Sequence, residues 1–550
     1  MNKSLPVTIL LALLLTQATP AARGESGCDQ ILKEATAQFA RGKIIDASQT
    51  LEKGQKSCSQ SSKYQLLLST VLSRRHGFQV QAAEAARRAT ELDPQSRAAY
   101  LQLGVCLMAL KDQEGAAGAF ENLVKVDPTS YEAWSSLGQL YLAQGKGEEA
   151  KLCAKKAACL EPESRAAKLN SIKSLAKIGK FDQARGALKQ LLDSDSLEPE
   201  FFILVAETAK DCGAYEEAIQ AGDRVLQTYP QSQQALEAKA VSQLWLRQYK
   251  GCLETAASMK EPQEIQALAY LKLGNLKEAR AAHQAIAKGS EESRLAQLGG
   301  GLIKLRDGNL SEALKKIEGS LAEDQLFAPS HMELARIYLA LGDFKKAEEE
   351  ASEVERLPSA KASALALLGR AIILKGQGLE NLSLASKKLN EAHKLDEKNP
   401  DALIGLGLLK LKSGNVDQAK DYARQCLKVE PGNIDGLMLS ARINFARGDK
   451  KAAARDLKNA RAQAPGSGTV LVTMAEQLLS EGKADKAIKL LQSKVDSAGD
   501  YPPLEFTLAK ILNEKGDKAS AAVHFKNSLN KGLAGKNASE AKKAIKEIVN

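Results

Sequence analysis

The stretch Tyr131-Glu-Ala-Trp134-Ser-Ser-Leu137-Gly138-Gln-Leu-Tyr141 decides the fold of this 550-residue chain. Its large side chains recur every three or four residues, which predicts a helix with one apolar face. Small residues and a proline follow at fixed offsets: Ala150, Ala154, Ala157 and Pro162. The segment that starts at Arg97 has the same pattern 34 residues earlier, with Tyr100, Leu103, Gly104, Leu107, Ala116, Phe120, Leu123 and Pro128. The chain is therefore built from repeats of about 34 residues, each with two short helices.

The repeats extend over roughly residues 28–533. We place the first residues of successive units at Cys28, Lys63, Arg97, Tyr131, Arg165, Pro199, Gln233, Lys260, Arg294, Ala328, Ala362, Pro400, Ile434, Gly468 and Pro502. Glycines such as Gly145, Gly342 and Gly448 mark the turn between the two helices, because glycine readily takes the left-handed conformation that ends a helix. Prolines such as Pro128 and Pro162 then end the second helix.

This large–Leu–Gly–large pattern, followed by Ala–large–Ala–Pro, resembles the tetratricopeptide repeat. The resemblance implies an all-α, right-handed superhelical solenoid of about 15 helix–turn–helix repeats. Small residues at the eighth and twentieth positions, such as Gly138 and Ala150, allow the two helices of a unit to approach closely. The resemblance also implies a concave groove, lined by the first helices, in which such proteins bind other proteins.

The first 24 residues predict a secretion signal. Lys3 supplies the positive start, residues 7–15 the apolar segment, and residues 18–24 the small-residue exit. Cleavage after Ala22 and cleavage after Gly24 both fit the pattern. The short, simple signal indicates bacterial export, with the mature protein in the periplasm or outside the cell. A lipid anchor at Cys28 is disfavoured, because Glu25 stands where a lipobox has leucine.

Two irregularities interrupt the repeats. The spacing from Gln233 to Lys260 is 27 residues, so the second helix of that unit, residues 252–259, is truncated. Three glycines, residues 299–301, then fall inside a first helix, where each costs about 1 kcal/mol relative to alanine. We therefore expect a bend between an N-terminal array, residues 25–259, and a C-terminal array, residues 260–533. Residues 534–550 predict a capping helix with Ala541, Ala544, Ile545 and Ile548 on its apolar face.

Composition narrows the classes of function. The chain has 77 Lys and Arg against 67 Asp and Glu, a net charge of +10. The charges alternate along the helices, which is typical of a solvated surface and not of a nucleic-acid-binding stripe. After the N-terminus no segment reaches the roughly 18 apolar residues of a membrane span. We therefore expect no nucleic-acid partner and no transmembrane span in the mature chain.

No constellation of residues indicates catalysis. The five histidines fall in five different repeats, and none belongs to a metal-ligand motif. No phosphate-binding loop and no Gly-x-Ser-x-Gly motif are present, so we predict no enzyme activity, no metal and no cofactor. Among the eight cysteines, Cys28 and Cys58 mark the adjoining ends of the first antiparallel helix pair. They form a disulfide there, or they are two unrelated thiols.

In tetratricopeptide proteins the groove is lined by positions 2, 5, 9, 12 and 13 of each first helix. Between residues 241 and 445 these positions are largely apolar, with interspersed arginines. The candidates for partner contact are Trp245, Leu302, Met332, Arg336, Arg442 and Phe445. Two interpretations remain open, because apolar groove residues are covered either by a partner or by tighter superhelical packing.

The resulting hypothesis is a non-catalytic protein-interaction scaffold of the bacterial cell envelope. It would bind a protein partner in the groove, in export or in envelope assembly. Two alternatives remain: a groove that binds an extended polymer such as a glycan or a peptide, and a non-catalytic subunit of an enzyme complex.

Overall fold

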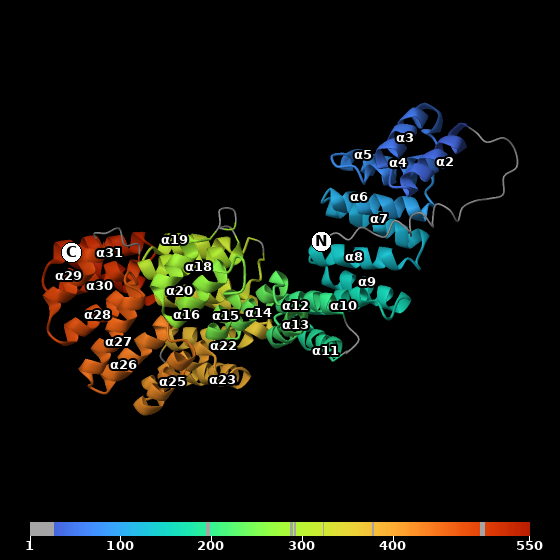
Figure 1. Ribbon diagram of the computed structural model, residues 1–550. Helices are drawn as coiled ribbons and strands as arrows, with labels where there is room; N and C mark the ends of the chain where they lie inside the picture. The colour runs from blue at the N-terminus through green and yellow to red at the C-terminus, as the bar shows by residue number, and fades with distance from the viewer. Residues whose placement is uncertain are drawn as a thin grey trace. The chain divides into compact units, whose positions relative to one another are not determined.

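The structure is a computed structural model that describes residues 27–193, 198–286, 290, 293–322, 324–376, 379–495 and 501–549. Over this part of the chain it consists of helices and turns, without strands (Figure 1). No helix of the described residues is long and apolar enough to cross a membrane. The predicted secretion signal, residues 1–24, lies outside the described residues.

Helices alternate between the first and second helix of a repeat. The first helices are α2 (Gly27–Ala40), α4 (Ser62–Leu72), α6 (Arg97–Ala109), α8 (Tyr131–Ala143), α10 (Arg165–Lys177), α12 (Pro199–Asp211), α14 (Gln233–Trp245), α16 (Gln263–Leu273), α18 (Arg294–Asp307), α20 (Ala328–Leu341), α22 (Pro358–Lys375), α24 (Pro400–Lys412), α26 (Ile434–Ala446), α28 (Gly468–Ser480) and α30 (Pro502–Glu514). The second helices are α3 (Ile44–Cys58), α5 (Gln79–Leu92), α7 (Gln113–Val126), α9 (Gly147–Leu160), α11 (Phe181–Leu192), α13 (Tyr215–Thr228), α15 (Tyr249–Ala256), α17 (Leu276–Gln284), α19 (Leu310–Gly319), α21 (Phe344–Val354), α23 (Leu379–Leu395), α25 (Val416–Val429), α27 (Lys450–Gln463), α29 (Ala484–Val495) and α31 (Lys518–Asn530). The predicted fold class, an all-α solenoid of about 15 helix–turn–helix repeats, is confirmed.

Most first helices begin at the predicted residue, and many are capped there by the side chain of the preceding residue. Ser130, for example, accepts a hydrogen bond from the main-chain N–H of Ala133 in the first turn of α8. Two starts differ from the prediction by more than one residue. Helix α16 begins at Gln263, with Pro262 as the residue that precedes its first turn. Helix α22 begins at Pro358, because a proline fits well in the first turn of a helix.

Small residues bring the two helices of a repeat together, as the pattern predicts. A Cβ atom on Gly104 would lie 2.6 Å from the ring of Phe120 in the second helix. Ala116, at the equivalent close contact, is fully buried. The glycine turns have positive φ, for example 76° at Gly145. Arg247 takes the same left-handed conformation, with φ of 62°, without being glycine.

The chain forms two compact units, residues 1–187 and 188–550, which divide within α11. This division differs from the predicted one at residues 259 and 260. A single hydrophobic cluster within the second unit includes side chains from both sides of that point, from Ala240 through Leu268 to Leu298. Helix α15 is short, as the 27-residue spacing predicts.

The glycine triplet at residues 299–301 lies inside one uninterrupted helix, α18, and all three glycines are buried. A Cβ on Gly301 would lie 2.5 Å from Ile317 and 3.0 Å from the carbonyl oxygen of Ala313, both in α19. Gly301 therefore serves close helix packing in this structure. The expected bend in this region remains a prediction.

Each end of the described chain carries a local feature. Cys28 and Cys58 are joined by a disulfide between α2 and α3, with their Cα atoms 5.5 Å apart. At the other end, α32 (Gly535–Val549) buries Ala541 and packs Ala544 and Ile545 against the hydrophobic cluster of the second unit.

Candidate binding cavity

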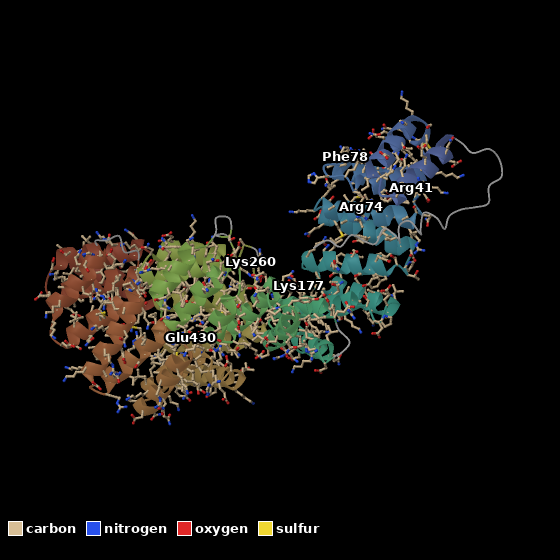
Figure 2. All side chains as sticks on the ribbon, viewed as in Figure 1. Arg41, Arg74, Phe78, Lys177, Lys260 and Glu430 are labelled. Atoms are coloured by element: carbon tan, nitrogen blue, oxygen red, sulfur yellow. A yellow bond between two sulfur atoms is a disulfide. The ribbon has the colours of Figure 1, made fainter. Side chains whose placement is uncertain are left out.

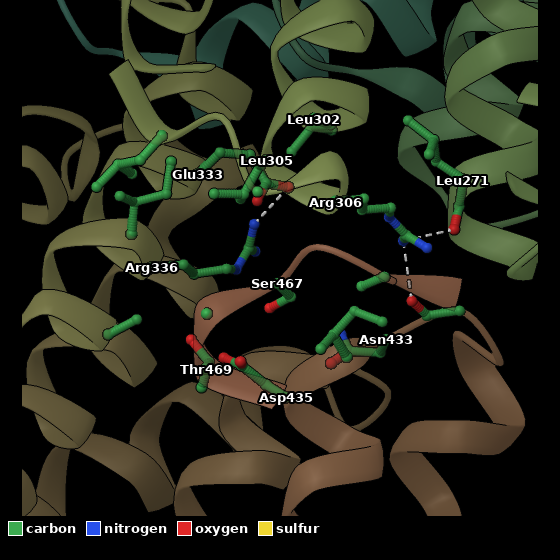
Figure 3. Close-up of a pocket in the computed structure, with 18 of the residues that line it drawn as sticks. Leu271, Leu302, Leu305, Arg306, Glu333, Arg336, Asn433, Asp435, Ser467 and Thr469 are labelled. Carbon is green, nitrogen blue, oxygen red and sulfur yellow. Dashed lines mark hydrogen bonds and ion pairs between the residues drawn. The ribbon is translucent and has the colours of Figure 1, made fainter. Parts of the chain in front are cut away.

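Two adjoining cavities lie within the second unit, on the side lined by first helices. The larger has a volume of about 150 Å³ and the smaller of about 90 Å³. They share one wall, formed by Lys272, Leu302, Glu333, Arg336, Asp401 and Glu430. We call these two spaces the inner cavities and their common side the shared wall. Figure 3 shows Glu333 and Arg336 on one side of the larger cavity and Arg306 on another.

The shared wall is a network of ion pairs centred on Arg336. The Arg336 side chain donates to both carboxylate oxygens of Asp401, from Nε over 2.9 Å and from Nη2 over 2.6 Å. Its Nη1 atom lies 2.7 Å from Glu333. Arg370 also donates to Asp401, over 3.0 Å. Asp401 is 1% exposed, so each of its oxygens is satisfied by an arginine rather than by water.

Lys272 and Glu430 extend the network towards α16 and the turn before α26. The Lys272 ammonium lies 3.2 Å from Glu333 and 3.9 Å from Glu430. The Tyr249 hydroxyl donates to Glu430 over 2.7 Å. Figure 2 shows Glu430 among the helices of the second unit. These contacts join residues that are far apart in sequence, with 181 positions between Tyr249 and Glu430.

The network changes the acidity of its members. Burial alone would raise the pKa of Asp401, but the charges and hydrogen bonds of Arg336 and Arg370 outweigh it and bring the pKa to about 2. Burial likewise opposes ionisation of Glu333, yet Arg336 and Lys272 hold its pKa below the usual range. Burial and the neighbouring Glu430 carboxylate raise the pKa of Tyr249. At neutral pH the network therefore combines the ionised carboxylates of Asp401 and Glu333 with a neutral Tyr249.

Local helix geometry supports the positions of these charges. Asp401 and Asp435 lie in the first turns of α24 and α26, where the helix dipole favours carboxylates. Arg306 lies in the last turn of α18, where the dipole favours cations. Arg370 donates to both aspartates and so connects these two helix starts.

The rest of the larger cavity is apolar, with a group of hydroxyls at one side. Its apolar lining is provided by Leu271, Leu302, Leu305, Ile337, Ile404 and Ile434. Ser467, Thr469 and Tyr501 contribute hydroxyl groups. In the smaller cavity, Trp245 lies edge-on to Phe327, with 6.1 Å between ring centroids.

The structure brings together four of the six predicted groove residues. Trp245 and Met332 line the smaller cavity, and Leu302 and Arg336 line both. Arg442 and Phe445 line neither of the inner cavities: the Arg442 side chain is exposed, and Phe445 packs against a separate cluster around Leu457.

Sequence reasoning missed Lys272, Glu333, Asp401 and Glu430. The position rule could have found Lys272, at position 13 of its repeat, and Asp401, at position 2. Glu333 and Glu430 lie at other positions of their repeats, and contacts between distant repeats bring them to the cavities. Nothing in the local pattern indicates those contacts.

Other titratable pairs lie outside the inner cavities and connect the two helices of one repeat. His331 and Glu350 are 2.7 Å apart, and His524 and Glu505 are 2.6 Å apart. Among the described residues, no group of three or more His, Cys, Asp or Glu side chains could hold a metal ion.

First helices of stacked hairpins thus enclose the candidate site, which places the chain in the class of helical-repeat solenoids. Tetratricopeptide repeat models match residues 80–121, 114–158, 169–233, 266–326 and 404–468, and a second such model matches residues 328–358. Together these stretches cover more than half of the chain, and the chain belongs to the tetratricopeptide repeat family.

Proteins similar to this chain include one curated sequence and one solved structure. Protein STIP1 homolog of Dictyostelium discoideum is 30% identical over 113 residues, which is 20% of this chain and 19% of that protein. The chain thus matches about a fifth of the length of this curated relative. A chain in the crystal structure of the APC/C hetero-tetramer Cut9-Hcn1 aligns over 99% of both chains, with a TM-score of 0.58 and 16% identity. This second likeness concerns the fold. Tetratricopeptide repeat proteins bind protein partners, and family membership supports a protein-interaction scaffold.

Proposed function

We propose that this scaffold captures an extended segment of a partner protein in the inner cavities of its second unit. The observation that carries the proposal is the lining of the two inner cavities, which combines an apolar surface with balanced charges and a group of hydroxyls. Four cations line the two cavities, Arg247, Lys272, Arg306 and Arg336, and they are matched by four carboxylates, Glu333, Asp401, Glu430 and Asp435. A lining with balanced charges offers no net field to a phosphate or another strongly charged ligand.

An uncharged peptide segment fits this chemistry. Its apolar side chain would contact Leu302, Leu305 and Ile337, and its main-chain groups would bond to the hydroxyls of Ser467 and Thr469. A cavity of about 150 Å³ accommodates a benzene-sized group. The anchor is therefore a single leucine, isoleucine or phenylalanine side chain, and the rest of the segment lies outside the cavity.

Filling the cavity tests the proposal. Ala340 lines the larger cavity and is itself exposed, so Ala340→Phe places a ring in the space without removing a core side chain. Ala143→Phe is the matched control, because Ala143 is exposed at the same repeat position in the first unit. Partners captured by the wild-type protein from an envelope extract are identified by mass spectrometry, and the segment in contact is located by cross-linking.

We expect Ala340→Phe to weaken capture of such a partner by about tenfold or more, equivalent to about 1.4 kcal/mol. Ala143→Phe should leave capture unchanged. Capture that survives Ala340→Phe but is lost in Ala143→Phe would place the binding surface on the first unit and contradict the proposal.

We further propose that the protein is exported and acts in the bacterial cell envelope. The N-terminal signal pattern supports this, as does the pairing of Cys28 with Cys58, because disulfides persist in oxidising compartments. N-terminal sequencing of the mature protein from an envelope fraction should give a start between about residues 22 and 26. A cytoplasmic product that keeps Met1 would contradict export.

A further inference from the structure

Within the second unit, the turns before α26, α28 and α30 lie against the C-terminal ends of three earlier first helices, α16, α18 and α20. The N–H of Gly432 donates to the carbonyl oxygen of Lys272 over 3.0 Å, and the N–H of Gly466 donates to that of Arg306 over 2.9 Å. The donor follows the acceptor by 160 residues in both pairs. The Tyr501 hydroxyl donates to the carbonyl oxygen of Ala340 over 2.9 Å, at a separation of 161 residues. A hydrogen bond to the end of an earlier first helix therefore recurs in three successive repeats, twice from a glycine N–H and once from a tyrosine hydroxyl, and we call these contacts the seam.

The seam depends on glycine. A Cβ atom on Gly466 would overlap the carbonyl oxygen of Asp307, and one on Gly432 would overlap the main chain of Gly274. Neither of these two late glycines has a positive φ. Glycine is therefore needed at both positions for close approach of two main chains and not for backbone conformation.

Arg306 crosses the seam. Its guanidinium donates from Nη2 to the carbonyl oxygens of Leu271, over 2.9 Å, and Gly432, over 3.0 Å. Its Nη1 atom donates to the carbonyl oxygen of Gln463 over 3.2 Å. One side chain thus links an early repeat to the turns on both sides of α26 and α27, as Figure 3 shows for Leu271.

The larger inner cavity lies between the two sides of the seam. Leu271, Leu305 and Ile337 line it from the early repeats, and Asn433, Ser467 and Tyr501 line it from the late ones. Atoms that face a cavity lack contacts on that side, so the attraction between the two sides is weaker there than in a packed core. Separation of the seam would widen the cavity directly.

We propose that the seam is a gate: closed, it encloses the larger cavity, and open, it admits a segment to that cavity. The use of the gate for a partner rests on the proposed function, but the opening itself is a property of this chain. Repeat proteins have stability that is largely local, so one set of contacts between distant repeats can separate while neighbouring hairpins remain packed.

A buried thiol in the cavity reports on the gate without any partner. Ile337 is 4% exposed and lines the larger cavity, so Ile337→Cys supplies a target that a bulky maleimide reaches only when the cavity opens. Fluorescein maleimide labelling of that cysteine is followed by mass spectrometry. The native buried thiols Cys106 and Cys153, in the first unit, are internal controls in every sample.

Two variants of this reporter loosen the seam at different atoms. Gly466→Ala forces two main chains apart, and Arg306→Met removes the donors to three carbonyl oxygens. Gly299→Ala is the control, because its Cβ would make an ordinary 3.7 Å contact with Leu268. Far-ultraviolet circular dichroism checks that each variant keeps its helices.

We expect both seam variants to label at position 337 at least about fivefold faster than the parent, with helicity retained. Gly299→Ala and the two internal control thiols should not change. Unchanged labelling in both folded variants would overturn the gate, and so would loss of the helical signal in both, since the seam would then belong to the folding core. Failure of Ala340→Phe to affect partner capture would refute the proposed function while leaving these labelling rates valid.

Discussion

Replacing Asp401 by asparagine should test the shared wall most directly. Asp401 is 1% exposed and bonds to Arg336 and Arg370, and the arginines lower its pKa from 3.8 to about 2. A shift of that size corresponds to about 2 kcal/mol of stabilisation at neutral pH. The substitution also removes one counter-charge from the buried Arg370 and from the partly buried Arg336, which keep Asp435 and Glu333 as partners. Breaking a buried pair typically costs about 3–5 kcal/mol. We therefore expect Asp401→Asn to lower the free energy of unfolding of the second unit by about 3 kcal/mol at pH 7.

The pH dependence follows from the direction of the pKa change. The pKa of Asp401 is depressed in the folded protein, so its contribution is complete above the ordinary value of 3.8 and is lost as the pH falls towards 2. The difference in stability between wild type and Asp401→Asn should therefore be constant from pH 7 to about pH 5 and should shrink below pH 4.

Trp245 makes the measurement specific to the second unit. The chain has two tryptophans, and a Trp134→Phe background leaves Trp245, beside the shared wall, as the single emitter. Urea unfolding is followed by its fluorescence at several pH values. The matched control is Asp417→Asn: Asp417 pairs with Arg447 over 2.8 Å but is 90% exposed, and such a pair contributes at most about 1 kcal/mol. If the two substitutions cost the same, or if the Asp401 difference does not shrink in acid, the wall does not stabilise the unit as argued.

Three further predictions concern single contacts. Gly301→Ala should lower the melting temperature clearly, since overpacking typically costs about 1–3 kcal/mol, whereas Gly299→Ala should be tolerated; equal melting curves would contradict the packing argument. Burial opposes protonation of His331, but its bonds to Glu350 and a main-chain carbonyl raise its pKa. The stability that His331→Gln removes should therefore be largest below pH 6.5 and fall as the pH rises, which urea unfolding at pH 6 and pH 9 measures. Reduction of the Cys28–Cys58 disulfide should accelerate amide exchange in α2 and α3 and leave α8 unchanged; equal exchange in both redox states would show that the bond does not hold this repeat.

The repeat pattern predicted the hairpins well because each hairpin is stabilised by local contacts. Position rules identified the close helix contacts, such as Gly104 with Phe120, and the left-handed turns, such as Gly145. Both features depend on residues fewer than about 34 positions apart, so a pattern within one repeat contains the information. A propensity scale considers one helix, so it assigns only a cost to the glycine triplet and does not include the packing of Gly301 against α19.

The candidate site was predictable only in part. The position rule selected Leu302 and Arg336, which line both inner cavities, but it treated Arg336 as an anchor for a partner. In the structure Arg336 is paired with Asp401 and Glu333, so its replacement by glutamate would disrupt the wall as well as any binding. Two interpretations were left open for the groove: a partner covers it, or tighter superhelical packing does. At Arg336 the packing of a distant repeat provides much of the cover, through Asp401.

The two seam glycines, Gly432 and Gly466, can be recognised in the sequence. A proline ends the second helix of many repeats, and the residue after it is Gln95, Thr129 or Glu163 in the first unit but glycine in Pro431-Gly432 and Pro465-Gly466. A side chain at this position is acceptable where nothing approaches the turn, and it is excluded where Gly274 or Asp307 lies against it. Which earlier turn comes into contact depends on the small rotation between successive repeats, accumulated over about five of them, and on the long α22 in between. Gly432 and Gly466 thus mark the positions at which another stretch of main chain approaches. Which stretch approaches is determined by the superhelical geometry of several repeats, and the sequence of a single repeat does not contain that information.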